Sequence, residues 1–167
     1  CGGEDAQAVQ VGGPSGQMVP AEASERTIGY EDLATGGSVM VFGPKRDLLE
    51  AVEKFMRFFV EESCGYCTPC RVGNRLLLER LERLLDGKGE PGDIEYLEDL
   101  GKTVITMSRC GLGQTSANPI LSAIESFRAD FEKRLTERHD GLLPSFDLGE
   151  AVAGAEEIAN RKSAHAE

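Results

Sequence analysis

The sequence predicts a mostly α-helical protein, a four-helix bundle preceded by a short β-rich remnant. Residues 1–43 carry short β-type apolar runs that are separated by glycine and proline. From Lys45 onward the apolar residues recur at the i, i+3, i+4 spacing of amphipathic helices. Four such stretches with short connections are typical of a helix bundle.

Two runs near the start of the chain predict strands. Residues 8–11 end at a cluster of turn-forming residues at 12–16, and residues 39–42 lie between glycines. Two or three strands this short cannot bury a core alone. Residues 1–43 are therefore expected to be the end of a β-rich domain that begins upstream.

The first two helices are bounded by glycine-rich segments. The first follows Lys45 and continues to Cys64, and the second follows Gly73. It ends just before Gly87, a residue suited to the left-handed position after a helix. Their apolar faces are expected at Leu48, Leu49, Val52, Phe55, Met56, Phe59, Leu77, Leu78, Leu81, Leu84 and Leu85.

The third and fourth helices carry N-terminal signals. We expect Asp93 to cap the third helix, and Asn118 to cap the fourth, with Pro119 at the first helical position. Their apolar faces are expected at Ile94, Leu97, Leu100, Val104, Ile105, Met107, Ile120, Ile124, Phe127, Phe131 and Leu135. The bundle then covers residues 44–138, and residues 139–167 form a flexible or partner-bound tail with one weak helix near 151–160.

Composition excludes several function classes. The formal net charge of −11 argues against nucleic-acid binding, which needs lysine and arginine for phosphate contacts. The apolar runs are too short to span a membrane, and no signal peptide is visible, so we expect no membrane insertion and a cytoplasmic protein. No nucleophile or acid–base constellation appears, so no catalytic residue is predicted.

The five cysteines point to a metal site. Cys64, Cys67 and Cys70 are too close in sequence for unstrained disulfides, and an odd total does not suit a disulfide framework. Three cysteines at intervals of three, with Cys110 as the fourth, are typical of a [4Fe–4S] cluster with Cys₄ ligation. Cys1 lacks a partner motif and is not expected to be a ligand.

Zinc is the alternative metal, since it also takes four cysteines. Zinc ligands usually come from two separate Cys-x-x-Cys pairs, and Cys110 has no such neighbour. With zinc, the chain would be a zinc-stapled helical scaffold or interaction domain without redox function.

Residues beside the cysteines fit a bulky inorganic core. We expect Pro69 to keep Thr68 out of helical conformation, and Arg71 to place a positive charge beside the cluster. Four glycines are expected to let the backbone approach the cluster, namely Gly65, Gly73, Gly111 and Gly113.

The segments ESCGYCTPCRVG (62–73) and SRCGLGQT (108–115) closely resemble one family. This is the C-terminal part of the NADH-binding flavoprotein subunit of complex I and its relatives in NAD(P)-linked hydrogenases and formate dehydrogenases. The resemblance spans about residues 8–135 and is closest to the hydrogenase diaphorase branch. It implies that residues 1–43 end a β-grasp-like (soluble-ligand-binding) domain, that 44–138 form the iron–sulfur bundle, and that Cys64, Cys67, Cys70 and Cys110 are the ligands.

The resemblance also implies a function. The chain would take single electrons from a flavin and pass them on within an NAD(P)H-linked multisubunit oxidoreductase. FMN and NAD(P)H are expected only on an upstream domain, because no glycine-rich dinucleotide motif lies within these residues. The chain is then not active alone. Its expected partners are a thioredoxin-like iron–sulfur subunit and a further cluster-bearing subunit.

Overall fold

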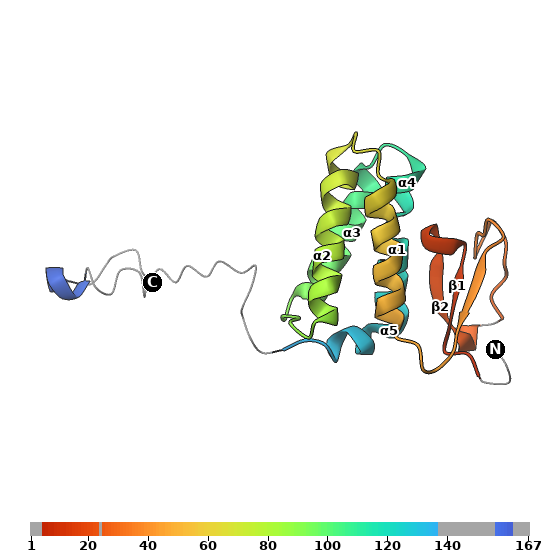
Figure 1. Ribbon diagram of the computed structural model, residues 1–167, viewed down its shortest axis with the longest axis horizontal. Coiled ribbons are helices and arrows are strands. Elements are labelled where there is room, and N and C mark those ends of the chain that lie inside the picture. The colour runs from red at the N-terminus through yellow and green to blue at the C-terminus, as the bar shows by residue number, and fades with distance from the viewer. Residues whose placement is uncertain (1–4, 24, 137–155, 162–167) are drawn as a thin grey trace. The chain divides into compact units, whose positions relative to one another are not determined.

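A small sheet and a set of helices make up the protein (Figure 1). The computed structural model describes residues 5–23, 25–136 and 156–161. The chain divides into two units at residue 138, so the sheet and the helices belong to one compact unit. This arrangement confirms the predicted fold class, a mostly helical chain preceded by a short β-rich segment.

The sheet has three antiparallel strands, β1 (Ala8–Val11), β2 (Gln17–Pro20) and β3 (Val39–Phe42), in the order β2-β1-β3. Both predicted strands are present, whereas β2 was not predicted because only two of its four residues are apolar. A Cβ on Gly16 would lie 1.7 Å from the Val11 carbonyl oxygen, so the tight return from β1 to β2 requires glycine there.

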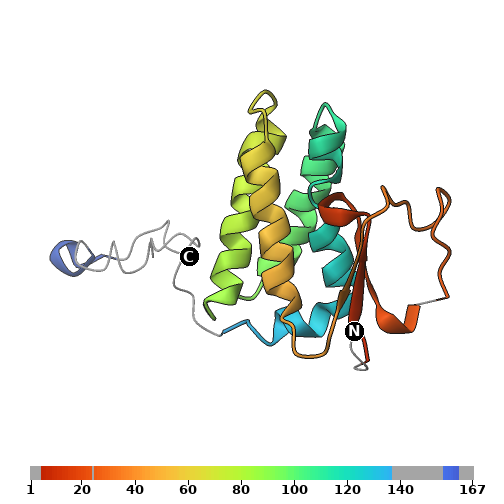
Figure 2. The same ribbon diagram turned by 45° about the vertical axis from the view of Figure 1, so that its right-hand side comes forward.

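The four predicted helices are α1 (Leu48–Glu62), α2 (Asn74–Leu85), α3 (Asp93–Met107) and α5 (Asn118–Glu132). A short helix, α4 (Gly111–Thr115), was not predicted. Figure 2 shows that α1 and α3 run towards the same end of the bundle, where the α1–α2 connection and α4 lie. Asp47 begins α1 by accepting hydrogen bonds from the backbone N–H groups of Leu49 and Glu50.

Two predicted helix caps are wrong by one residue. The cap of α3 is Gly92, and the Asp93 carboxylate instead accepts the Glu90 backbone N–H at 2.9 Å. The cap of α5 is Ala117, while the Asn118 side chain donates to the Ser15 carbonyl oxygen at 2.8 Å. Asp93 also pairs with Arg80 of α2, so in both helices a tertiary contact takes the side chain that would otherwise have capped the helix.

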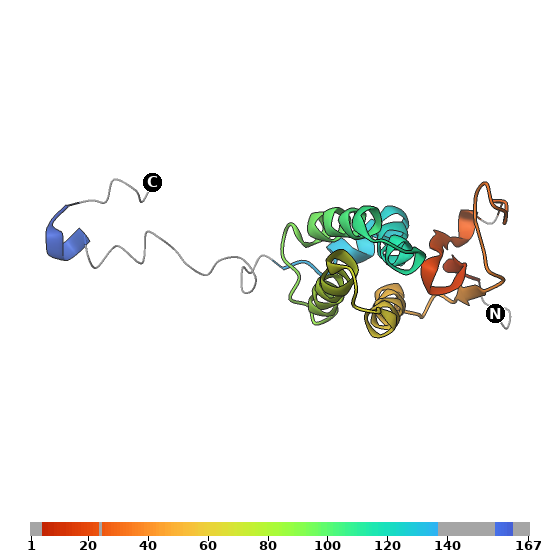
Figure 3. The same ribbon diagram turned by 90° about the horizontal axis from the view of Figure 1, so that it is seen from above.

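The core lies between the helices and extends to the sheet face that α5 covers. Figure 3 shows the sheet on one side of the bundle. Met18 of β2 belongs to the same apolar cluster as Ile120 and Ile124, and its backbone N–H donates to Ser122 Oγ at 2.9 Å. All the predicted core residues are buried or half-buried except Met107, which is 63% exposed at the end of α3.

The end of the bundle opposite α4 holds a buried ion-pair network. Arg80 of α2 pairs with Asp93, and Arg83 pairs with Glu90. The Arg80 guanidinium also lies 4.3 Å from the centroid of the Tyr96 ring. These contacts hold the start of α3 against α2. The charged groups that make them are largely buried.

Outside the compact unit, residues 156–159 form one helical turn. The rest of the helix predicted near 151–160 lies almost wholly outside the described residues, as do Cys1 and most of the predicted tail. Among the described residues, no helix has the length and apolar character needed to cross a membrane.

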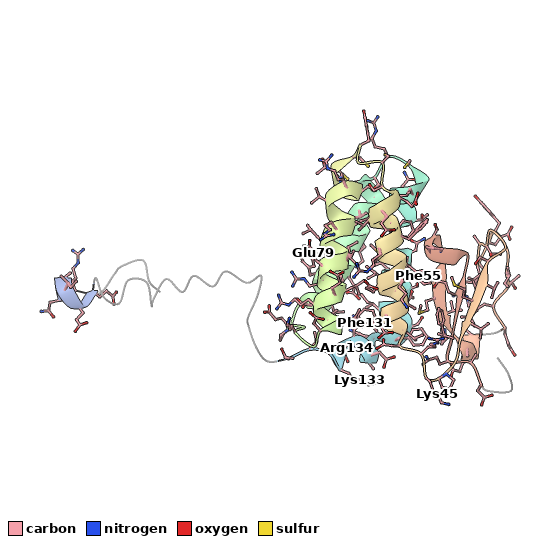
Figure 4. All side chains as sticks on the ribbon, in the orientation of Figure 1. Lys45, Phe55, Glu79, Phe131, Lys133 and Arg134 are labelled. Carbon is pink, nitrogen blue, oxygen red and sulfur yellow. The ribbon has the colours of Figure 1, made fainter. Side chains whose placement is uncertain are left out.

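The ion-pair network gives a stability prediction. Asp93→Ala would leave Arg80 buried without its partner, which typically costs about 3–5 kcal/mol. We expect a large loss in the free energy of unfolding, measured by denaturant titration. Glu79→Ala is the matched control, since Glu79, which is labelled on α2 in Figure 4, forms an exposed i,i+4 pair with Arg75 at 2.8 Å. Its expected effect is below about 1 kcal/mol. Similar losses in the two variants would contradict a structural role for the network.

Candidate metal centre

The four predicted cysteines line one cavity. This cavity has a volume of about 90 Å³ and lies at the end of the bundle where α1 ends and α4 begins. Its lining consists of Cys64, Cys67, Cys70 and Cys110 with Glu62, Ser63, Tyr66 and Leu112. The structure therefore brings together a triad and a fourth cysteine that is 40 positions further along the chain.

The first cysteine segment is a tight loop that leads into α2. Gly65 has a positive φ of 78°, which reverses the chain between Cys64 and Cys67. A π-helical turn, η3 (Pro69–Gly73), then continues directly into α2. Such turns are rare and are frequently found at functional sites.

The expectation that Pro69 excludes helix at Thr68 is wrong. Thr68 has helical dihedrals, φ −57° and ψ −44°. Proline is accommodated because it stands in the first turn, where its missing N–H has no partner to lose. The backbone N–H of Arg71 donates to the Cys67 carbonyl oxygen at 3.0 Å, so the helical turn starts inside the cysteine motif.

The second segment places Cys110 in extended conformation just before α4. A Cβ on Gly113 would lie 2.5 Å from Ser108 Cβ and 3.2 Å from Cys70 Cβ. Glycine is therefore required for α4 to approach the Cys70 side of the cavity. Gly73 has a different role from the one predicted, since its missing Cβ makes room for Val104 of α3, at 2.3 Å. Gly111 faces open space.

The four thiols have different environments. Cys70 is buried, with 5% of its surface exposed, whereas Cys64 and Cys110 are exposed and Cys67 is intermediate. Burial raises the pKa of the Cys70 thiol, and the nearby Cys67, Cys110 and Cys64 thiolates raise it further. The pKa of Cys67 is lowered, mainly by a hydrogen bond from the backbone of Arg109, the residue before Cys110. The two cysteine segments thus contact each other directly.

Two polar side chains lie next to the buried sulfur. Ser63 Oγ and Asn74 Nδ2 each lie 3.4 Å from Cys70 Sγ. Asn74 is fully buried at the start of α2, and its Oδ1 accepts a hydrogen bond from Ser116 Oγ at 2.7 Å. Sequence reasoning missed Asn74 and Ser116. The one sequence feature that could have indicated Asn74 is its polar character at the start of an apolar helix, directly after Gly73.

Tyr66 and Arg109 connect the two cysteine segments at the surface. Arg109 Nη1 donates to the Tyr66 hydroxyl at 3.1 Å, and its guanidinium lies 5.2 Å from the ring centroid. Arg71 Nη1 donates to the Gly65 carbonyl oxygen at 2.6 Å and so braces the loop between Cys64 and Cys67. Arg71 does not line the cavity.

The cavity fits a polynuclear cluster better than one zinc ion. Among the described residues, no three cysteine, histidine or acidic side chains are arranged to hold a single metal ion. Four sulfurs at about 2.3 Å from one zinc would leave no free space between them. The observed 90 Å³ is several times the roughly 10–15 Å³ that admits one water. A set of four thiols around such a space suits the ligation of a [4Fe–4S] cluster.

Comparison with known proteins gives a consistent result. The family model for the NADH-ubiquinone oxidoreductase-F iron-sulfur binding region matches residues 50–134. The alpha subunit of the NAD-reducing hydrogenase HoxS of Cupriavidus necator is 48% identical over 93% of this chain and 26% of its own length. An NADH-quinone oxidoreductase subunit of Streptomyces coelicolor is 33% identical over 76% of this chain and 30% of its own length.

A solved structure extends the similarity to the fold. A crystal structure of an NAD⁺-reducing [NiFe]-hydrogenase in the H₂-reduced state matches with a TM-score of 0.77 and 38% identity. The match covers 98% of this chain and 29% of the hydrogenase chain. The chain spans between a quarter and about a third of the length of the curated relatives named here.

The close approach of α4 to Cys70 can be tested with two glycines. Gly113→Ala places a methyl group against Ser108 and Cys70, and overpacking of this kind costs about 1–3 kcal/mol. We expect a lower free energy of unfolding by denaturant titration, and less iron bound per chain. Gly111→Ala is the control, because a Cβ there meets nothing within 4 Å. Equal behaviour of the two variants would refute the tight packing at Gly113.

Proposed function

Because the chain belongs to the family of the NADH-ubiquinone oxidoreductase-F iron-sulfur binding region, whose cofactor is a [4Fe–4S] cluster, we propose that it is an electron-relay domain. We propose Cys64, Cys67, Cys70 and Cys110 as the four ligands. The observation that carries this proposal is their convergence, from two distant segments, on one cavity of about 90 Å³.

The protein's own groups supply the binding site. When bound, a [4Fe–4S] cluster exchanges one electron at a time, which links two-electron flavin and nicotinamide chemistry to single-electron transfer. The backbone at Arg109 stabilises the Cys67 thiolate. Asn74 donates to Cys70 Sγ, and Ser63 Oγ lies 3.4 Å from the same sulfur. Tyr66 and Arg109 connect the two segments at the edge of the site.

The setting of the relay is proposed from the relatives. The chain is 48% identical to a subunit of an NAD-reducing hydrogenase and 33% identical to a subunit of an NADH-quinone oxidoreductase, which favours the hydrogenase diaphorase branch. In this proposal electrons come from a flavin, with FMN and NAD(P)H on an upstream domain. Residues 1–43 would be the end of a β-grasp-like domain, 44–138 the iron–sulfur bundle and 139–167 a tail.

The proposed partners are other subunits of the same oxidoreductase. They include a thioredoxin-like iron–sulfur subunit and a further cluster-bearing subunit that accepts the electron. Cys64 and Cys110 are exposed, and Met107 lies nearby at the end of α3, so the site is open at this end of the bundle for transfer to a neighbour.

Ligand substitution tests the site. We expect the chain purified without oxygen to bind about four irons, as a [4Fe–4S] cluster requires. Replacing Cys64, Cys67, Cys70 or Cys110 singly by serine is expected to reduce iron and acid-labile sulfide strongly, because each change removes one thiolate ligand. Cys1→Ser is the matched control and keeps full iron content. Full iron in Cys110→Ser would show that the fourth ligand is misassigned.

The relay role predicts dependence on a flavin domain. The purified chain is expected neither to retain FMN nor to oxidise NADH with an artificial acceptor. When the flavin-bearing part of the same subunit is added, NADH should bleach the visible absorption of the chain. Turnover of NADH by the chain alone would contradict the relay assignment, and the absorption change provides a readout that is separate from turnover.

A further inference from the structure

Cys70 differs from the other three thiols in its burial and in its side-chain donors. Its sulfur is buried, and Asn74 Nδ2 lies 3.4 Å from it with no exposed surface on Asn74. A buried amide next to a buried sulfur has no role in the apolar packing of α2. Such a group normally persists only when its hydrogen bonds are satisfied.

Ser116 contacts the other end of this amide. Ser116 Oγ, which is also fully buried, lies 2.7 Å from Asn74 Oδ1, to which it donates, and 3.1 Å from the Gly113 carbonyl oxygen. The reverse orientation of the amide would place Oδ1 against Cys70 Sγ, and two acceptors would then face each other once the thiol is deprotonated. A deprotonated sulfur therefore favours the arrangement in which Nδ2 points to it, and Ser116 then donates to Oδ1.

We propose that Asn74, hydrogen-bonded at Oδ1 by Ser116, is a positioning residue that raises the reduction potential of the cluster through its hydrogen bond to Cys70. This rests on the proposed ligand role of Cys70. Reduction adds negative charge that is shared by the sulfurs, and a hydrogen bond to a charged acceptor is stronger than one to a neutral acceptor. The bond therefore favours the reduced state, as hydrogen bonds to cluster sulfurs do in general.

Burial distinguishes Asn74 from Ser63, the other polar side chain next to Cys70. Ser63 also lies 3.4 Å from Cys70 Sγ, but it is only half-buried in the Cys64 loop, where water can replace a lost donor. At Asn74 no exposed surface is available for a replacement. Loss of the Asn74 donor therefore leaves the sulfur with one polar partner fewer, and the reduced state loses stabilisation.

The test is a redox titration of the full chain, purified without oxygen and followed by low-temperature electron paramagnetic resonance. Asn74→Leu keeps the branched shape of the side chain but removes the donor, so we expect a lower midpoint potential at full iron content. Ser116→Ala leaves every group that touches Cys70 in place, and we expect a smaller shift in the same direction. Ser122→Ala, which removes a hydroxyl on the sheet side of α5, is the control and should keep the wild-type potential.

The outcomes separate this inference from the proposed function. A wild-type chain without a cluster would overturn the proposed function itself. Loaded variants of Asn74 whose potential is unchanged or higher would overturn only the role of Asn74. If Asn74→Leu fails to bind iron, the potential of Ser116→Ala decides alone, and a value equal to wild type overturns the inference. A merely structural role would alter iron content or stability without lowering the potential.

Discussion

The convergence of four sulfurs at one end of the bundle is the constraint on which the remaining structure depends. Cys70 and Cys110 can meet only if the α1–α2 connection and the start of α4 lie at the same end. Helices α1 and α3 start from the other end and have 15 residues each, or about 22 Å at 1.5 Å per residue. Because these two helices have equal lengths, both cysteine segments lie at the same height along the bundle. Gly73 makes room for Val104 of α3, and Gly113 allows α4 to approach Cys70.

The two ends of the bundle are stabilised by different means. At one end, Arg80 and Asp93 form a buried pair that needs no cofactor. At the other, four thiols line one cavity, and burial raises the pKa of Cys70. If the four cysteines hold the cluster as proposed, their thiolates bring like charges together, and the iron ions of the cluster offset them. Iron binding is then coupled to proton release and to the stability of the α1–α2 connection.

Sequence reasoning predicted the parts of the fold that depend on local periodicity. The four long helices and two strands follow from spacing alone, and spacing also selected the four cysteines that line the cavity. It failed where a tertiary contact competes with a local preference. Asp93 pairs with Arg80 and Asn118 binds the Ser15 backbone instead of capping their helices. Pro69 occupies a first helical turn that Thr68 joins. Asn74 was missed because its partner Ser116 lies 42 positions away.

X-ray absorption of the chain purified without oxygen tests the central claim most directly, because it identifies the metal and its neighbours together. The account predicts absorption at the iron edge, with sulfur in the first shell and iron in the second, as a [4Fe–4S] cluster on four cysteines requires. Absorption at the zinc edge alone, with four sulfurs at about 2.3 Å and no second metal, would contradict it.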